Sequence, residues 1–174
     1  MKKKTTNVVQ FLDGLHRFIV ESPQFRDRTT DRSEIDIQAE IRPLIIRYLE
    51  DHFRAKGFAD PVAKANKSFY WEGQEGHFGK LRPTTFGSRN YPDFLITDPY
   101  LVAIEYKQSP NGSTVKRGIG QSIMHTLSGD FDFVYYLFHD ESKRKDIRSS
   151  QSNQKEAMIL DRMWQEFNVR IRFV

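Results

Sequence analysis

Helix-like and strand-like patterns alternate along the chain from residue 34 to its last residue. Apolar residues spaced three and four positions apart predict helices, whereas short apolar runs bounded by turn residues predict strands. The helices are expected at 34–56, 115–127 and 154–167, and the strands at 65–72, 94–97, 101–107, 131–138 and 169–174. The expected order is helix, three strands, helix, strand, helix, strand. This order predicts an α/β domain, in which helices flank a central mixed sheet.

The first 33 residues are expected to be an accessory segment. Apolar side chains over residues 7–20 are spaced for one face of a short helix, and the polar stretch that follows contains Pro23. We therefore interpret 1–33 as an N-terminal helix and linker, and 34–174 as the main domain. Pro43 lies inside the next helical pattern and either kinks that helix or marks its true start.

Composition limits the kinds of site that the chain can build. The 174 residues are enough for one domain, and aromatic residues make up 13% of them, which argues against a disordered chain. There is no cysteine, so disulfides, zinc–thiolate sites, iron–sulfur clusters and a cysteine nucleophile are excluded. The five histidines lack metal-ligand spacing.

Charge and hydropathy bear on partners and location. The formal net charge of +4 permits a polyanionic partner without requiring one. The lysines at residues 2–4 resemble the start of a signal peptide, but Asp13, His16 and Arg17 interrupt any apolar stretch behind them. No apolar run approaches the roughly 20 residues that a membrane span needs. We expect a cytoplasmic protein with no membrane association.

Three chemically informative residues lie on two successive strands. Because side chains alternate between the faces of a strand, Glu105 and Lys107 share a face. Asp93 opens the preceding strand, and the turn at Asp98-Pro99 is expected to make the two strands neighbours. Asp93 and Glu105 are then expected to face each other.

Two facing carboxylates repel each other, and a hard divalent cation relieves that repulsion. Oxygen ligands without sulfur favour Mg²⁺, with Mn²⁺ as a substitute. Such an ion activates water and neutralises phosphate charge, while Lys107 beside it orients the water. The residues therefore predict a phosphodiesterase centre. The structural alternative is that Asp93 only caps its strand and that Glu105 only forms a salt bridge with Lys107.

The spacing of Pro92-Asp93 and Glu105-Tyr106-Lys107 resembles the signature of the PD-(D/E)XK nuclease superfamily. The resemblance covers about residues 34–174. It implies a restriction-endonuclease-like fold with an αβββαβ core and a C-terminal αβ unit. It also implies a Mg²⁺-dependent deoxyribonuclease, with an endonuclease favoured. RNA as substrate and a homodimer both remain open.

By the same resemblance Asp93 and Glu105 hold the metal, the Tyr106 carbonyl is a further ligand, and Lys107 assists the attacking water. Family members often add a glutamate from the first core helix, for which Glu40 is the candidate and Glu34 the rival.

Some branches of the superfamily carry a glutamine on the helix after the lysine strand, followed four residues later by tyrosine. Gln121 supplies the glutamine, but His125 occupies the tyrosine position. Ile119, Ile123 and Leu127 are expected to hold this helix on the sheet and to turn Gln121 toward Glu105.

Basic residues supply candidate DNA contacts in two places. Lys80, Arg82 and Arg89 lie in a glycine-rich stretch over 73–90, for which an ordinary solvated loop is equally compatible. Lys116 and Arg117 begin the helix that carries Gln121, although charged helix ends are common. The leading alternative function is a catalytically inactive nucleic-acid-binding or complex-forming subunit. An α/β domain of another class is the third interpretation.

Overall fold

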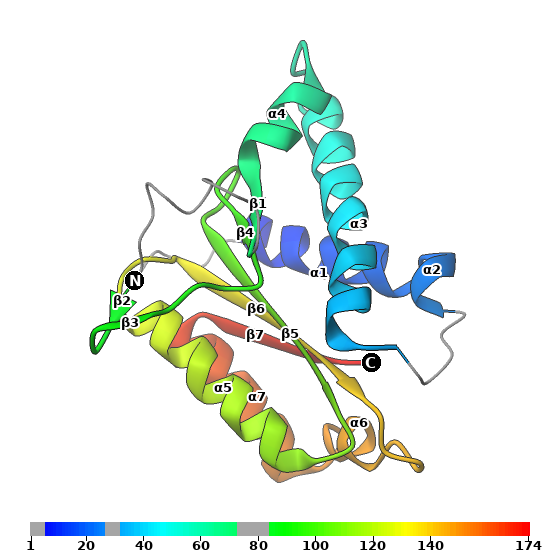
Figure 1. Cartoon of the computed structure of the whole chain (residues 1–174), viewed down its shortest axis with the longest axis vertical. Coiled ribbons are helices and arrows are strands. Elements are labelled where there is room, and N and C mark those ends of the chain that lie inside the picture. Colours follow the sequence, from blue (N-terminus) through cyan, green and yellow to red (C-terminus); the bar gives the residue numbers. More distant parts are fainter. Residues whose placement is uncertain (1–5, 27–31, 73–83) are drawn as a thin grey trace.

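The computed structural model describes residues 6–26, 32–72 and 84–174. These residues form an α/β architecture (Figure 1). Its helices are α1 (Thr6–Val20), α2 (Pro23–Arg26), α3 (Glu34–Ala55), α4 (Pro61–Ser68), α5 (Gly112–Leu127), α6 (Asp146–Ser150) and α7 (Gln154–Phe167). Its strands are β1 (Phe69–Trp71), β2 (Thr84–Thr85), β3 (Ser88–Arg89), β4 (Phe94–Ile96), β5 (Val102–Ser109), β6 (Phe133–Asp140) and β7 (Val169–Phe173). None of the described helices is long and apolar enough to cross a membrane.

Five strands form a mixed sheet in the order β1-β4-β5-β6-β7, and β2 pairs with β3 in a separate hairpin. The neighbours β1, β4 and β5 run antiparallel, whereas β5, β6 and β7 run parallel. Parallel neighbours need a crossover, and α5 and α7 supply the two crossovers in this sheet. The predicted α/β class and the mixed sheet flanked by helices are confirmed.

Apolar side chains from both faces of the sheet form the core. On one face α1 and α3 pack against alternate residues of the central strands, among them Val102, Ile104 and Tyr106 of β5. On the other face, α5 and α7 pack against Ala103 and its neighbours (Figure 1). β5 is therefore covered by helices on both sides, and its polar residues Glu105 and Ser109 are buried, whereas Lys107 and Gln108 near its end are partly exposed.

The long helix α3 begins earlier than its proline alone would require. Ser33 caps it, because the Ser33 hydroxyl accepts from the Asp36 N–H and the Asp36 carboxylate accepts from the Ser33 N–H. This capping box starts the helix at Glu34, so Pro43 lies inside it. The first turn of α3 thereby extends to the edge of β5, where Lys107 lies.

The N-terminal helix belongs to the same core as the main domain. Five of its side chains are buried against α3 and the sheet: Val8, Phe11, Leu12, Leu15 and Ile19. Asp13 forms ion pairs with Arg170 and Arg172, which attach α1 to the last strand. The segment interpreted as accessory thus packs as part of the sheet's cover.

Three local expectations were wrong. Residues 65–68, expected to begin a strand, form the end of α4, because Asp60 caps this helix and Pro61 starts it. Residues 146–150, where no helix was expected, form the short helix α6. Leu127, expected to hold α5 on the sheet, is mostly exposed at the end of that helix. Of the glycine-rich stretch 73–90, residues 73–83 lie outside the described residues.

Gly118 allows α5 to approach β6 closely. A Cβ atom added at Gly118 would collide with the hydroxyl and ring of Tyr136, which is fully buried and cannot move aside easily. A Cβ added at Gly120, two residues later, would meet nothing. Gly118 therefore sets the distance between α5 and the sheet.

We predict that Gly118→Ala destabilises the fold by roughly 1–3 kcal/mol through overpacking. Gly120→Ala in the same helix is the matched control, and it should raise stability by about 0.5–1 kcal/mol because alanine has the higher helix propensity. Urea unfolding followed by circular dichroism measures both changes. Equal effects of the two substitutions would show that α5 does not pack closely at Gly118.

Candidate metal-dependent active site

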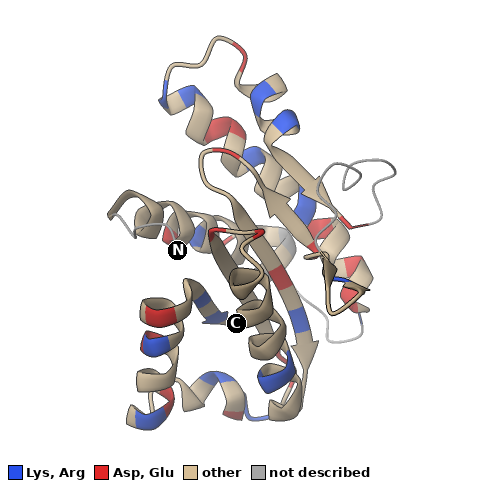
Figure 2. Cartoon of the chain, turned by 90° about the vertical axis from the view of Figure 1, so that its left-hand side faces the viewer, with Lys and Arg blue, Asp and Glu red and all other residues tan. Residues whose placement is uncertain are grey.

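Two carboxylates meet on neighbouring antiparallel strands. In the register of β4 and β5, Phe94 pairs with Ile104 and Leu95 with Ala103, so Asp93 and Glu105 are the next residues opposite each other. The side chain of Asp93 is 8% exposed and that of Glu105 is 0% exposed. Figure 2 shows acidic and basic segments in succession along the central strand.

Asp93 is oriented by the backbone of the strand beside it. One carboxylate oxygen, Oδ2, accepts a hydrogen bond of 2.7 Å from the backbone N–H of Tyr106. The Tyr106 ring is buried on the opposite face of the sheet, among the α1 and α3 contacts. The part of Tyr106 that meets Asp93 is therefore its amide.

Lys107 lies among three carboxylates. Its Nζ atom is 2.9 Å from Glu34 Oε1, 3.6 Å from Asp93 Oδ2 and 4.0 Å from Glu105 Oε2. Burial lowers the pKa of Lys107, but the three acids outweigh that effect and the net shift is upward. The Lys107 side chain is therefore protonated and positively charged at neutral pH.

The structure brings Glu34, and not Glu40, to this lysine. Glu40 lies almost two turns further along α3 and pairs with Arg32. Glu34, in the first turn, reaches Lys107 across the end of β5. The backbone oxygen of Arg32 also accepts a hydrogen bond from Gln108, which holds the start of α3 near β5.

Two residues of α5 hold the buried carboxylate of Glu105. His125 Nε2 lies 2.6 Å and Gln121 Nε2 lies 3.2 Å from Glu105 Oε1. The other oxygen, Oε2, has no hydrogen-bond partner in the described part of the chain and faces Lys107. Oε1 of Glu105 is thus held by hydrogen-bonding residues of α5, whereas Oε2 can accept a further partner.

The contact between His125 and Glu105 was not predicted from the sequence. It is fully buried, and burial lowers its pKa to about 4, so its imidazole is neutral at pH 7. Its Nδ1 has no hydrogen-bond partner among the described residues, which agrees with a tautomer that carries the proton on Nε2 and donates to Glu105. The four-residue spacing from Gln121 was the signal, because it puts both residues on one helix face.

Burial and mutual repulsion change the protonation of the two acids. Burial and the neighbouring Glu105 carboxylate together raise the pKa of Asp93 to about 7, with Lys107 and the Tyr106 N–H partly opposing the shift. The pKa of Glu105 is also raised, chiefly by burial. One proton is therefore easily retained by the pair near neutral pH, and a nearby cation favours its release.

The donor set suits a hard cation that keeps most of its water. The described residues contain no cluster of three His, Cys, Asp or Glu side chains in a metal-holding arrangement. Asp93 and Glu105 provide two carboxylates, and Mg²⁺ is commonly bound through one or two carboxylates with waters completing its shell. The buried Oε2 of Glu105, which lacks a hydrogen-bond partner, is the atom that a cation would satisfy.

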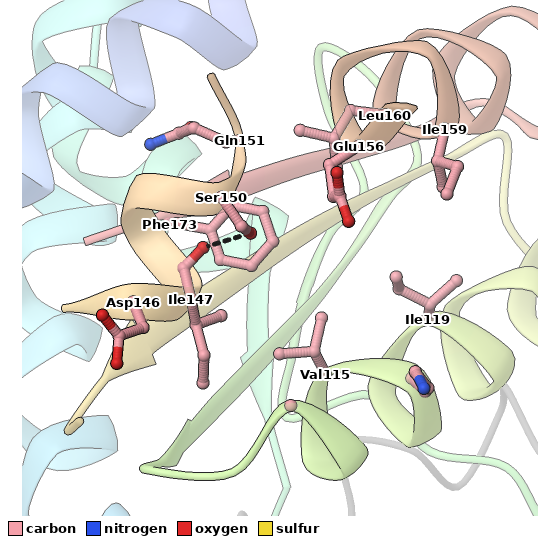
Figure 3. Close-up of a pocket in the computed structure, with 12 residues that line it drawn as sticks. Val115, Ile119, Asp146, Ile147, Ser150, Gln151, Glu156, Ile159, Leu160 and Phe173 are labelled. Carbon is pink, nitrogen blue, oxygen red and sulfur yellow. Dashed lines mark hydrogen bonds between the residues drawn. The ribbon is translucent and has the colours of Figure 1, made fainter. Parts of the chain in front are cut away.

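Three of the five basic residues proposed to contact DNA lie in the described part of the chain. Lys80 and Arg82 lie outside the described residues, whereas Arg89, Lys116 and Arg117 are exposed. Lys116 lines a mostly apolar pocket of about 400 Å³ between α5, α6 and α7. Figure 3 shows Val115, Ile119 and other apolar side chains in that pocket, which contains none of the acids described above.

Comparisons of this chain with protein-family models, with curated proteins and with solved structures found no match.

The raised pKa values predict how stability depends on pH. Asp93 and Glu105 hold protons more tightly in the folded state, so the stability that this pair contributes is lost as pH rises from about 4 to 8. The lowered pKa values of His16 and His125 act in the opposite sense below pH 6.5, so the contribution of the pair is isolated by comparing a variant with the wild type. Asp93→Asn, which removes one acid, should gain roughly 1–3 kcal/mol relative to the wild type between pH 5 and pH 8.

Denaturant unfolding in the presence of a chelator measures this difference. Asp51→Asn is the matched control, because Asp51 is an exposed acid of α3 whose pairing with Arg54 is local. If Asp93→Asn and the wild type show parallel pH profiles, the Asp93 carboxyl is ionised normally and the description of the pair is wrong.

Proposed function

We propose that the protein is a Mg²⁺-dependent nuclease that hydrolyses phosphodiester bonds in DNA, with a PD-(D/E)XK active site on a restriction-endonuclease-like fold. The observation that carries the proposal is the buried pair Asp93 and Glu105, with the Lys107 ammonium within 4.0 Å of both carboxylates. A merely structural ion pair does not need two buried acids side by side, because each additional acid adds repulsion and a desolvation cost.

Asp93 and Glu105 would hold the ion, with the Tyr106 carbonyl as a further ligand. When bound, Mg²⁺ supplies a water of lowered pKa and positive charge against the phosphate. The chain's own contribution is to present two fixed carboxylate oxygens. The Tyr106 N–H orients Asp93, and His125 and Gln121 orient Glu105.

Lys107 would act on the attacking water and on the phosphate. Its ammonium has three donors, of which Glu34 accepts one. The others can orient the water and neutralise charge that develops on the phosphoryl oxygens. Glu34 thereby keeps the ammonium at the mouth of the site, as a positioning residue.

Cleavage assays test the proposal directly. Plasmid, linear duplex, branched and single-stranded DNA are incubated with the protein in Mg²⁺, in Mn²⁺ and in a chelator. We expect products only with a divalent ion, and nicked or linearised plasmid identifies endonuclease action. If none of the substrates is cleaved in a metal-dependent way, the proposed enzymatic activity is contradicted and the alternative of an inactive subunit remains.

Asp93→Asn should abolish cleavage and weaken metal binding, because it removes a negative ligand while its side-chain oxygen can still accept from Tyr106. Calorimetric titration with Mn²⁺ and plasmid cleavage are the two measurements. Asp51→Asn serves again as the exposed control and should retain both properties. Unchanged metal affinity in Asp93→Asn would remove Asp93 from the ligand set.

Lys107→Met should reduce turnover by about 100-fold or more while DNA binding in Ca²⁺ changes little, because its hydrogen bonds would strengthen in the transition state. Methionine keeps the apolar stem and removes the donors. Lys155→Met, at an exposed position of α7, is the control for loss of one positive charge. If DNA binding and turnover fall together in Lys107→Met, the lysine is a phosphate contact.

A further inference from the structure

A small groove adjoins the candidate metal site on the side of α3 and β1. The acids Asp93 and Glu72 line it together with Gln38, Arg42 and Trp71. Its volume is about 180 Å³, below the roughly 300–1,000 Å³ of pockets that hold drug-sized ligands. The groove therefore suits a single planar ring system and is too small for a base pair.

The side chains of the groove have a particular combination of shape and charge. The guanidinium of Arg42 lies over the indole of Trp71, 4.5 Å from the ring centroid, so the two groups form a cation–π contact. Gln38, one turn before Arg42 on α3, adds an amide that both donates and accepts hydrogen bonds. Ile35, 75% exposed at the rim, adds an apolar contact.

These features together match a nucleobase. A base has a π face that stacks on indole or guanidinium, and a polar edge that an amide can read. The position of the groove is equally specific, because Asp93 belongs both to its lining and to the carboxylate pair. A base in the groove would therefore belong to a nucleotide next to the phosphate at the metal site.

We propose that this groove binds one unpaired base of the DNA strand being cleaved, so that the preferred substrate is single-stranded, flapped or frayed DNA. This inference rests on the proposed nuclease function. In an intact duplex both faces of a base are covered by its neighbours, so the base must leave the stack before it can enter the groove. A strand that is already unpaired avoids that cost.

Trp71 fluorescence gives a direct readout of the groove. The chain has two tryptophans, and Trp164→Phe leaves Trp71 as the sole one. We expect a 12-nucleotide single strand, titrated in Ca²⁺, to quench Trp71 emission. The same sequence in a blunt-ended duplex should bind through its backbone without comparable quenching. Free dAMP, tested alongside, shows whether a mononucleotide suffices.

Two variants test the stack itself. Arg42→Ala should weaken single-strand binding at least about 5-fold, within the range of one lost base–side-chain stack, and should change duplex binding little. Arg47→Ala, an exposed arginine of the same helix, is the charge-matched control. Trp71→Leu keeps an apolar side chain, and its folding is checked by thermal unfolding before anisotropy with a labelled strand.

The outcomes separate this inference from the nuclease proposal. Metal-dependent cleavage without quenching of Trp71 would overturn the proposal that the groove binds a base and leave the nuclease proposal standing. Equal effects of Arg42→Ala and Arg47→Ala on single-strand binding would do the same. Quenching of Trp71 and a selective loss of single-strand binding in Arg42→Ala, without any cleavage, would support base binding in the groove and overturn the nuclease proposal. No binding of either DNA, measured by anisotropy, overturns both.

Discussion

The rest of the site is arranged around the fully buried carboxylate of Glu105. Removing an unpaired carboxylate from water costs several kcal/mol, so its surroundings have to compensate. β5 contributes Lys107 from the same strand, and α5 contributes hydrogen bonds from Gln121 and His125. Those bonds require α5 to lie close to the sheet, which the absence of a side chain at Gly118 permits. Packing and electrostatics are thus linked through one helix.

The parts of the fold that were predictable depend on local patterns. The two strands joined by the Asp98-Pro99 turn were predictable because a short turn leaves antiparallel pairing as the simple solution. The helix over 154–167 was predictable because a long amphipathic pattern is a strong signal. The segment at 65–68 was not, because the helix that Asp60 caps and Pro61 begins continues up to the aromatic residues 69–71, which suggested an earlier start of the strand. The place of α1 in the core depends on contacts with residues more than 100 positions away.

The same distinction applies to the site. That Asp93 and Glu105 lie side by side could be predicted from strand alternation and one turn. The choice between Glu34 and Glu40 could not, because both follow the helical pattern and the crossing of α3 over β5 decides which one reaches the lysine. The contact from His125 to Glu105 depends on how closely α5 packs, a distance that no spacing in the sequence encodes. Side-chain periodicity indicates which face of a helix or strand a residue lies on, whereas tertiary packing decides which residue of that face reaches the site.

Lys107 links the resting protein to the proposed reaction. In the metal-free protein its ammonium is the counter-ion that Asp93 and Glu105 share, and those contacts, at 3.6 and 4.0 Å, are longer than its 2.9 Å hydrogen bond to Glu34. An ammonium held mainly by a third acid does not need to move far when another cation balances the pair. Its remaining donors then face the same side as the free oxygen of Glu105. In the proposed mechanism, Glu34 would therefore keep this lysine in place both before and after a cation binds.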